Sequence, residues 1–157
     1  TRRNHGLEHA TLNLLTRTQA GKPLAGHSDG GGFWILGDIP TELLSETVFE
    51  ALKKLKSGQE DLAIHKNCGT NLLVSGFAAG LAGAAGLIGA GERPRDKFER
   101  IPAITLLGVL ALLISRPLGP WVQKKLTTDG NPGSLSITSI TKLTSNGIPT
   151  HRVKTRV

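Results

Sequence analysis

Hydrophobic positions recur with helical spacing in two stretches near the start of the chain. Residues 4–18 carry an apolar stripe at three- and four-residue intervals, which predicts an amphipathic helix that Gly21 to Pro23 bring to an end. A second stripe runs from Leu44 to Leu55. It predicts another helix, with Pro40 in its first turn and Ser57-Gly58 after its last.

Shorter apolar stretches between turn residues predict strands. Residues 24–28 and 32–37 predict one hairpin, residues 61–65 a third strand, and residues 134–144 and 148–157 a C-terminal hairpin. The turns of the two hairpins fall on Asp29-Gly30-Gly31 and Ser145-Asn146-Gly147. We therefore expect an α+β head in the order α-β-β-α-β, which the C-terminal β-hairpin completes or flanks.

Two uncharged stretches differ from the rest of the chain. Residues 71–91 contain no charged residue, and residues 101–115 contain none either. Spanning a bilayer takes about 20 apolar helical residues, and the second stretch reaches that length if Arg116 snorkels and the helix continues to residue 122. The sequence thus predicts a two-helix transmembrane hairpin with spans at about 71–91 and 101–122.

This hairpin sets the expected organisation of the chain. It divides the sequence into an α+β head (1–70), a transmembrane hairpin (71–122) and a C-terminal linker with its β-hairpin (123–157). Two spans place both termini on one side of the membrane. Seven Lys and Arg residues lie near the spans on that side and four lie in the connecting loop, which favours cytoplasmic termini.

Small residues in the first span leave two alternatives for its packing. Gly76 and Gly80, and likewise Ala79 and Gly83, have the four-residue spacing that allows close approach of helices. This surface packs either against the second span or against a partner protein or pigment.

The charge of the chain bears on its partners. The 157 residues carry a formal net charge of +7, with an isoelectric point near 10.0. The basic residues are spread along the chain, aromatic residues make up 4 %, and no nucleic-acid-binding motif is present, so we expect lipid headgroups and other membrane subunits rather than nucleic acid as partners.

The first helix carries the chemically most informative pattern, His5-x-x-Glu8-His9. His5 and His9 lie one helical turn apart, so both imidazoles can reach one divalent metal ion. Glu8 is then a candidate general base for a metal-bound water. The pattern is similar to the inverted motif of the inverzincin peptidases, which are much larger, so only the local geometry is shared.

Further ligands are needed to complete such a site. Cys68 and His65 form an H-x-x-C pattern, and His27 and Asp29 are in reserve. Three protein ligands leave a position for water, whereas four close the site. We expect zinc or another divalent transition metal, with chlorophyll or haem as the alternative ligand of these histidines.

Two distinctive segments, the HxLEHAT segment at residues 5–11 and the CGTN segment at residues 68–71, carry a resemblance to a known family. Over residues 4–91 the chain resembles an uncharacterised family of small two-span membrane proteins found largely in phototrophic bacteria. This resemblance implies a photosynthetic or related energy-converting membrane, and it implies no activity and no catalytic residue.

Two functional hypotheses follow. In the first, the chain is a non-catalytic accessory or assembly subunit of a larger membrane complex, with a metal or tetrapyrrole site on the first helix. In the second, it is a membrane-anchored metal-dependent hydrolase that resembles a peptidase, in which Glu8 is the general base. We favour the accessory role.

Overall fold

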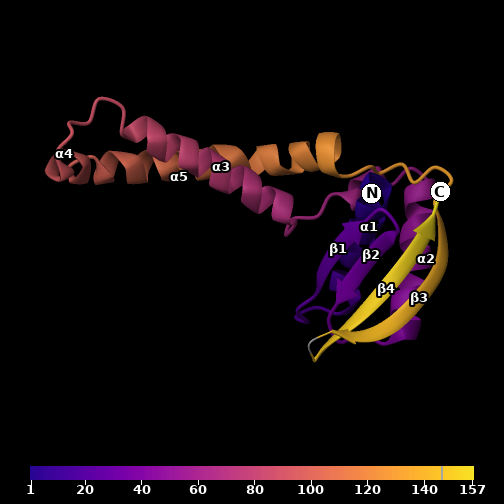
Figure 1. Ribbon diagram of the computed structural model, residues 1–157. Helices are drawn as coiled ribbons and strands as arrows, with labels where there is room; N and C mark the ends of the chain where they lie inside the picture. The colour runs from indigo at the N-terminus through magenta and orange to yellow at the C-terminus, as the bar shows by residue number, and fades with distance from the viewer. Residues whose placement is uncertain (146) are drawn as a thin grey trace. The chain divides into compact units, whose positions relative to one another are not determined.

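The computed structural model describes residues 1–145 and 147–157, and these residues form two units (Figure 1). One unit comprises Thr1–His65 and Lys124–Val157, and the other comprises Lys66–Gln123.

The first unit has the predicted α+β composition. Its helices and strands are α1 (Arg2–Thr18), β1 (Ala25–Asp29), β2 (Gly32–Leu36), α2 (Thr41–Lys56), β3 (Ser136–Ser145) and β4 (Ile148–Arg156). The strands form one antiparallel sheet in the order β1-β2-β4-β3. The C-terminal hairpin therefore completes the sheet, because β4 pairs with β2 on one side and β3 on the other. Asn146, in the predicted turn of this hairpin, lies outside the described residues.

Alternation along the strands explains how the sheet and helices pack. Phe33, Ile35 and Val153 are buried on the face that α1 and α2 cover, whereas Trp34 and Arg152 point to the opposite face. The amphipathic stripes of both helices are confirmed as core residues. The buried hydrophobic residues that the helices contribute are Leu7, Ala10, Leu12, Leu14, Leu15, Leu44, Val48, Ala51, Leu52 and Leu55.

The prediction of a third strand at residues 61–65 is wrong. The segment forms a 3₁₀ turn, η1 (Glu60–Ala63), in which the N–H of Leu62 bonds to the carbonyl of Gln59. The carbonyls of Leu62 and Ile64, which a strand would offer to its neighbour, each accept a hydrogen bond from the Asn13 amide at 2.9 Å. A side chain of α1 thus satisfies this backbone in place of a sheet.

The second unit is a pair of helices joined by a short helical loop. Its elements are α3 (Gly69–Gly86), α4 (Pro94–Phe98) and α5 (Ile101–Val122), and the helical path continues into the π-helical turn η2 (Gln123–Thr127). Figure 1 shows α3 and α5 side by side. Ser115 donates a hydrogen bond to Ser75 at 3.0 Å, and the fully buried Gln123 amide donates one to Asn71 at 2.6 Å.

Two membrane spans are not supported. Among the described residues, one helical segment, Pro94–Thr127, is long and apolar enough to cross a membrane, and it contains the predicted second span. The predicted first span is shorter than expected, because α3 ends at Gly86 and Gly89 turns the chain with a φ of +73°. Its apolar part, residues 72–86, measures only about 22 Å at 1.5 Å per residue, against about 30 Å for the hydrocarbon core.

The glycines of α3 divide between two faces of the helix. A Cβ at Gly86 would meet Ile104 of α5, so this glycine allows the close approach of the pair. A Cβ at Gly76 or Gly80 would meet no described atom within 4 Å. Of the two predicted alternatives, packing against the second span therefore applies to Gly83, whose Cβ would lie 3.8 Å from Ile104, and does not apply to Gly76 and Gly80, which face away from α5.

Candidate metal site

Two predicted metal ligands lie on one face of α1. His5 and His9 are separated by one helical turn, and their ring centroids are 4.3 Å apart with an interplanar angle of 61°. His9 is buried and His5 half-buried. The predicted juxtaposition of the two imidazoles is thus present in the folded chain.

Backbone carbonyls determine which nitrogen of each ring is available. Nδ1 of His5 lies 2.9 Å from the carbonyl oxygen of Thr127, and Nδ1 of His9 lies 2.8 Å from that of Ala63. A carbonyl oxygen only accepts hydrogen bonds, so Nδ1 must be the protonated nitrogen in both rings. The lone pair of each neutral imidazole is then on Nε2, the usual arrangement in a histidine that binds a metal.

A third imidazole belongs to the same unit. His65 follows η1, and its ring centroid lies 5.6 Å from that of His9. Imidazoles in adjacent positions around one ion, with metal–nitrogen distances of about 2.0–2.1 Å, have centroids roughly 4.5–5 Å apart. The His5–His9 and His9–His65 separations lie on either side of this value, so His9 has a neighbouring imidazole on two sides.

Glu8 is directed at β1. Its Oε2 accepts a hydrogen bond from the Ser28 hydroxyl at 2.8 Å, and Oε1 lies where a Cβ on Gly26 would be. The residue is 3 % exposed. Both carboxylate oxygens thus lie against the strand, where Glu8 joins α1 to the sheet.

Two further predicted ligands, Cys68 and His27, lie outside α1. Cys68 belongs to the helical unit, where its Sγ accepts the N–H of Thr70 and caps α3. That Cys68 completes the metal site stays a prediction. His27 is exposed on β1, on the strand face opposite to that of Ser28.

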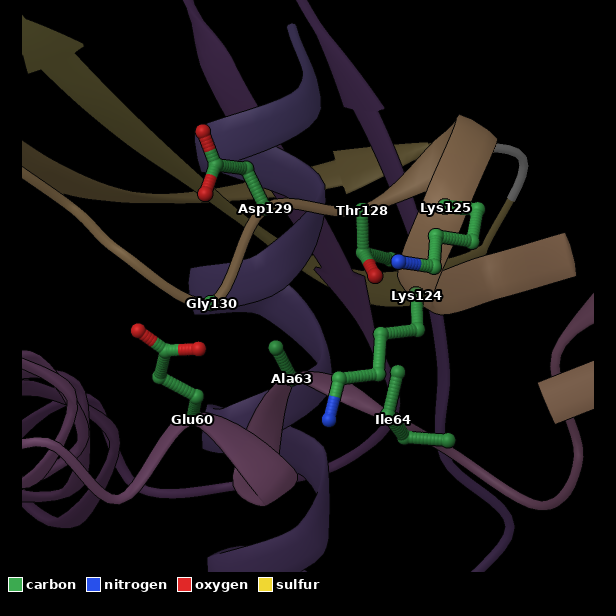
Figure 2. Close-up of a pocket in the computed structure, with 8 residues that line it drawn as sticks. All are labelled: Glu60, Ala63, Ile64, Lys124, Lys125, Thr128, Asp129 and Gly130. Atoms are coloured by element: carbon green, nitrogen blue, oxygen red, sulfur yellow. The ribbon is translucent and has the colours of Figure 1, made fainter. Parts of the chain in front are cut away.

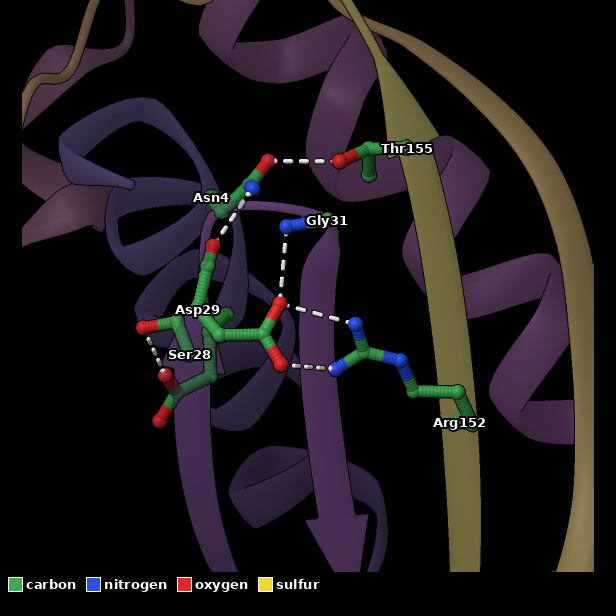
Figure 3. Close-up of polar contacts among 7 residues, drawn as sticks. Asn4, Ser28, Asp29, Gly31, Arg152 and Thr155 are labelled. Carbon is green, nitrogen blue, oxygen red and sulfur yellow. Dashed lines mark hydrogen bonds and ion pairs between the residues drawn. The ribbon is translucent and has the colours of Figure 1, made fainter.

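Asp29, the other reserve ligand, is bound to Arg152 instead (Figure 3). Both of its carboxylate oxygens accept hydrogen bonds from the guanidinium at 2.8 Å, and Gly31 donates a third from its backbone N–H. The bond to Arg152, helped by that of Gly31, lowers the pKa of Asp29 to about 2. Asp29 therefore ties the β1–β2 turn to β4.

A cavity of about 150 Å³ adjoins the two segments whose carbonyls bond to His5 and His9 (Figure 2). It lies between η1 on one side and η2 with the residues that follow it on the other, and α1 runs behind it. Its lining consists of Glu60, Ala63, Ile64, Lys124, Lys125, Thr128, Asp129 and Gly130. Charged groups of both signs surround it, and Lys124 lies 3.8 Å from Asp61.

Two polar residues of α1 outside the His5-x-x-Glu8-His9 pattern flank the histidines. Arg2 bonds to the carbonyls of Lys125 and Thr128, and Asn13 bonds to those of Leu62 and Ile64. Their signal in the sequence is the spacing 2, 5, 9 and 13, which places four polar side chains on one face of an amphipathic helix.

A fifth histidine, His151, is buried in the sheet and not on this helix face. His151 of β4 is 0 % exposed, and its Nε2 lies 3.0 Å from the Thr41 hydroxyl. Its Nδ1 has no hydrogen-bond partner among the described residues. Burial, together with the charge of Lys142, lowers the pKa of His151.

Comparison with known proteins identifies relatives without an assigned activity. A family model described as "Domain of unknown function (DUF6391)" matches residues 1–140. A protein of Picosynechococcus sp. described as uncharacterized is 33 % identical over 166 residues, which cover 99 % of this chain and 78 % of the relative. No solved structure matches the chain. The expectation of an uncharacterised family is confirmed.

Proposed function

The chain belongs to the DUF6391 family, and we propose that it is a membrane-associated accessory or assembly protein whose α+β unit holds a divalent transition-metal ion on His5 and His9, with His65 as the third ligand. The observation that carries this proposal is the pair of Nδ1–carbonyl bonds, which leave Nε2 of both neighbouring rings as the ligand atom.

Zinc is the metal that this donor set fits best. Neutral imidazoles suit zinc, copper, nickel and iron, and zinc takes three protein ligands with ease in a tetrahedral site. Cys68 is our proposed further ligand, since thiolate is a strong zinc ligand and the residue follows His65 by three positions. With Cys68 bound, the site has four protein ligands and is structural.

A tetrapyrrole is less well supported. Two axial histidines of one haem lie on opposite faces of the macrocycle, whereas the rings of His5 and His9 are 4.3 Å apart and leave no space for a macrocycle between them. Chlorophyll or haem would thus take one of these imidazoles alone.

The membrane association rests on the exposed apolar surface of the helical unit. Only 6 % of the most apolar 18-residue window in Pro94–Thr127 is buried. Exposure of such a surface to water is costly, and lipid or a partner helix would cover it. We propose that α3 and α5 enter the bilayer together as a hairpin, because a span by α5 alone would leave Thr1–His65 and Lys124–Val157, which share one sheet, on opposite sides of the membrane. In this proposal α5 is long enough to cross, and the shorter α3 crosses where the bilayer is locally thinned.

The accessory role is supported better than the hydrolase alternative. A general base must reach the water bound to the metal, and both oxygens of Glu8 lie against β1 instead. An energy-converting membrane is the setting that the resemblance implies.

Elemental analysis of the full chain, purified in mild detergent, tests the metal site. We expect about one metal ion per chain in the wild type, none in the His5→Ala/His9→Ala variant, and an unchanged content in the His27→Ala control, whose histidine is exposed. Equal metal content in all three proteins, or none in the wild type after incubation with zinc, would overturn the proposal.

A further inference from the structure

We propose that Arg2 and Asn13 are positioning residues of the histidine site, which hold two backbone carbonyls in place and thereby fix the tautomers of His5 and His9. This inference rests on the proposed metal site, but its first consequence, the position of two protons, exists without metal.

Asn13 acts on the carbonyl that His9 uses. Its Nδ2 donates hydrogen bonds to the carbonyls of Leu62 and Ile64, both at 2.9 Å. The carbonyl between these two, that of Ala63, accepts the bond from Nδ1 of His9 at 2.8 Å. The amide therefore holds the peptides on both sides of the acceptor and prevents rotation of the segment away from the ring.

Arg2 has the same relation to His5. Its Nη2 donates to the carbonyl of Lys125 at 3.1 Å and to that of Thr128 at 2.8 Å. The carbonyl of Thr127 lies between them in sequence and accepts the bond from Nδ1 of His5 at 2.9 Å. The Arg2 carbonyl in turn accepts the N–H of Asp129 at 3.1 Å, which ties the same segment to α1 a second time.

One helix face thus carries the whole arrangement. Asn13 follows His9 by four residues, and Arg2 precedes His5 by three, so the two polar residues flank the imidazoles above and below. Asn13 binds the two carbonyls that border the one used by His9, and Arg2 binds the carbonyl that follows the one used by His5 and the carbonyl two positions before it. Two chain segments distant in sequence are aligned by residues of a single helix.

The consequence for chemistry is a defined tautomer. In solution a neutral imidazole prefers to carry its proton on Nε2, the nitrogen that the metal requires free. A carbonyl held against Nδ1 reverses this preference, because it accepts a hydrogen bond from a protonated Nδ1. It also fixes the orientation of the ring, so the Nε2 lone pair is in position for the metal before the metal binds. Loss of such outer partners typically lowers metal affinity 10- to 100-fold.

Nitrogen NMR of the full chain, labelled with ¹⁵N-histidine and kept metal-free in detergent, measures the tautomers directly. For the wild type we expect His5 and His9 to be protonated on Nδ1. We expect Asn13→Ala and Asn13→Asp to shift His9 toward protonation on Nε2 while His5 is unchanged. Arg2→Gln should do the reverse.

Matched variants on the same helix serve as controls. Arg17→Gln removes an exposed guanidinium, and Thr16→Ala removes an exposed hydroxyl whose hydrogen bond stays within α1. Neither should change either tautomer. Far-ultraviolet circular dichroism confirms folding of each variant, and the two Asn13 substitutions provide a second chance if one of them fails to fold.

Zinc titration of the same proteins separates this inference from the proposed function. We expect the Asn13 and Arg2 variants to bind zinc 10- to 100-fold more weakly than the wild type and the controls. If the wild type binds zinc and the variants keep both tautomers and affinity, the positioning role is wrong and the metal site stands. If the tautomers respond but the wild type binds no zinc, the metal site is wrong and the positioning role stands.

Discussion

Neighbouring residues of α1 serve different purposes because successive side chains of a helix point in different directions. His5 and His9 direct Nδ1 at the carbonyls of Thr127 and Ala63, whereas Glu8 reaches Gly26 and Ser28 of β1. The H-x-x-E-H pattern therefore combines a pair of candidate ligands with a carboxylate that holds the helix on the sheet.

A double-mutant cycle tests this role of Glu8. Gly26→Ala places a methyl group against the Glu8 carboxylate, and we expect a loss of about 1–3 kcal/mol in the free energy of unfolding. In a Glu8→Ala background the same substitution should cost at least 0.5 kcal/mol less, by the usual size of a coupling energy between contacting residues. Denaturant unfolding of the four proteins measures the coupling.

Two further measurements complete this test. Gly30→Ala, whose Cβ would meet only the Thr1 hydroxyl, at 4.0 Å, among the described atoms, is the control and should show no coupling. Metal content should not change in Glu8→Ala. Additive effects of the two substitutions would show that Glu8 does not occupy the space beside Gly26.

His151 predicts a dependence of stability on pH. Burial holds the pKa of the folded His151 below the ordinary histidine value of about 6.5, so the unfolded chain binds the proton more readily. The free energy of unfolding must therefore fall as the pH drops below about 6.5. We expect His151→Leu to reduce this loss between pH 7 and pH 5. Thermal unfolding in the presence of a chelator measures it without a contribution from metal.

The exposed His27 provides the control for this experiment. His27→Leu should leave the slope of stability against pH as it is in the wild type. If the free energy of unfolding of His151→Leu depended on pH as it does in the wild type, burial of a neutral His151 would not be the cause of the pH dependence.

At the scale of elements, the pairing of α3 with α5 is the feature most open to direct measurement. Ser75 and Ser115 are hydrogen-bonded at 3.0 Å, and a Cβ at Gly76 would meet no described atom within 4 Å. In a Cys68→Ser background, we expect Ser75→Cys/Ser115→Cys to form an intramolecular disulfide on mild oxidation. Gly76→Cys/Ser115→Cys should stay reduced, as read by gel mobility. Equal oxidation of both pairs would contradict this packing.

The elements that were predictable from the sequence are those with a local cause. The apolar stripes of α1 and α2 and the turn residues of the first hairpin depend on neighbouring positions, and these elements are confirmed. The 3₁₀ turn η1 was not predictable, because the bonds from Asn13 to Leu62 and Ile64 join residues about 50 positions apart. The central position of β4 in the sheet depends on pairing between the two ends of the chain in the same way.

The candidate site was predictable to the same extent. Helical spacing alone brings His5 and His9 together, so the His5-x-x-Glu8-His9 pattern predicts both as ligands. The direction of Glu8 depends on where β1 lies, and the protonation of the rings depends on carbonyls from Ala63 and Thr127. No pattern within residues 5–9 carries that information.

At the scale of the whole molecule, the exposed apolar surface of α5 is the feature that a membrane would explain. Leu110 lies near the middle of α5 and is 45 % exposed, and Leu143 of β3 is 43 % exposed. We expect Leu110→Lys to weaken insertion into lipid vesicles about a hundredfold, because a lysine at the centre of a span costs about 2.5–3.5 kcal/mol. Leu143→Lys should insert like the wild type. Vesicle flotation measures both variants, and equal partitioning would exclude α5 as the span.

The central claim is that imidazoles of α1 bind a metal ion through Nε2, and X-ray absorption at the zinc edge tests it most directly. For the full chain loaded with one zinc per molecule, we predict imidazole scattering from at least two histidines at about 2.0–2.1 Å. The same signal should be absent from His5→Ala/His9→Ala and present in His27→Ala. Zinc surrounded by oxygen ligands without imidazole scattering, or an identical spectrum in the double variant, would contradict the account.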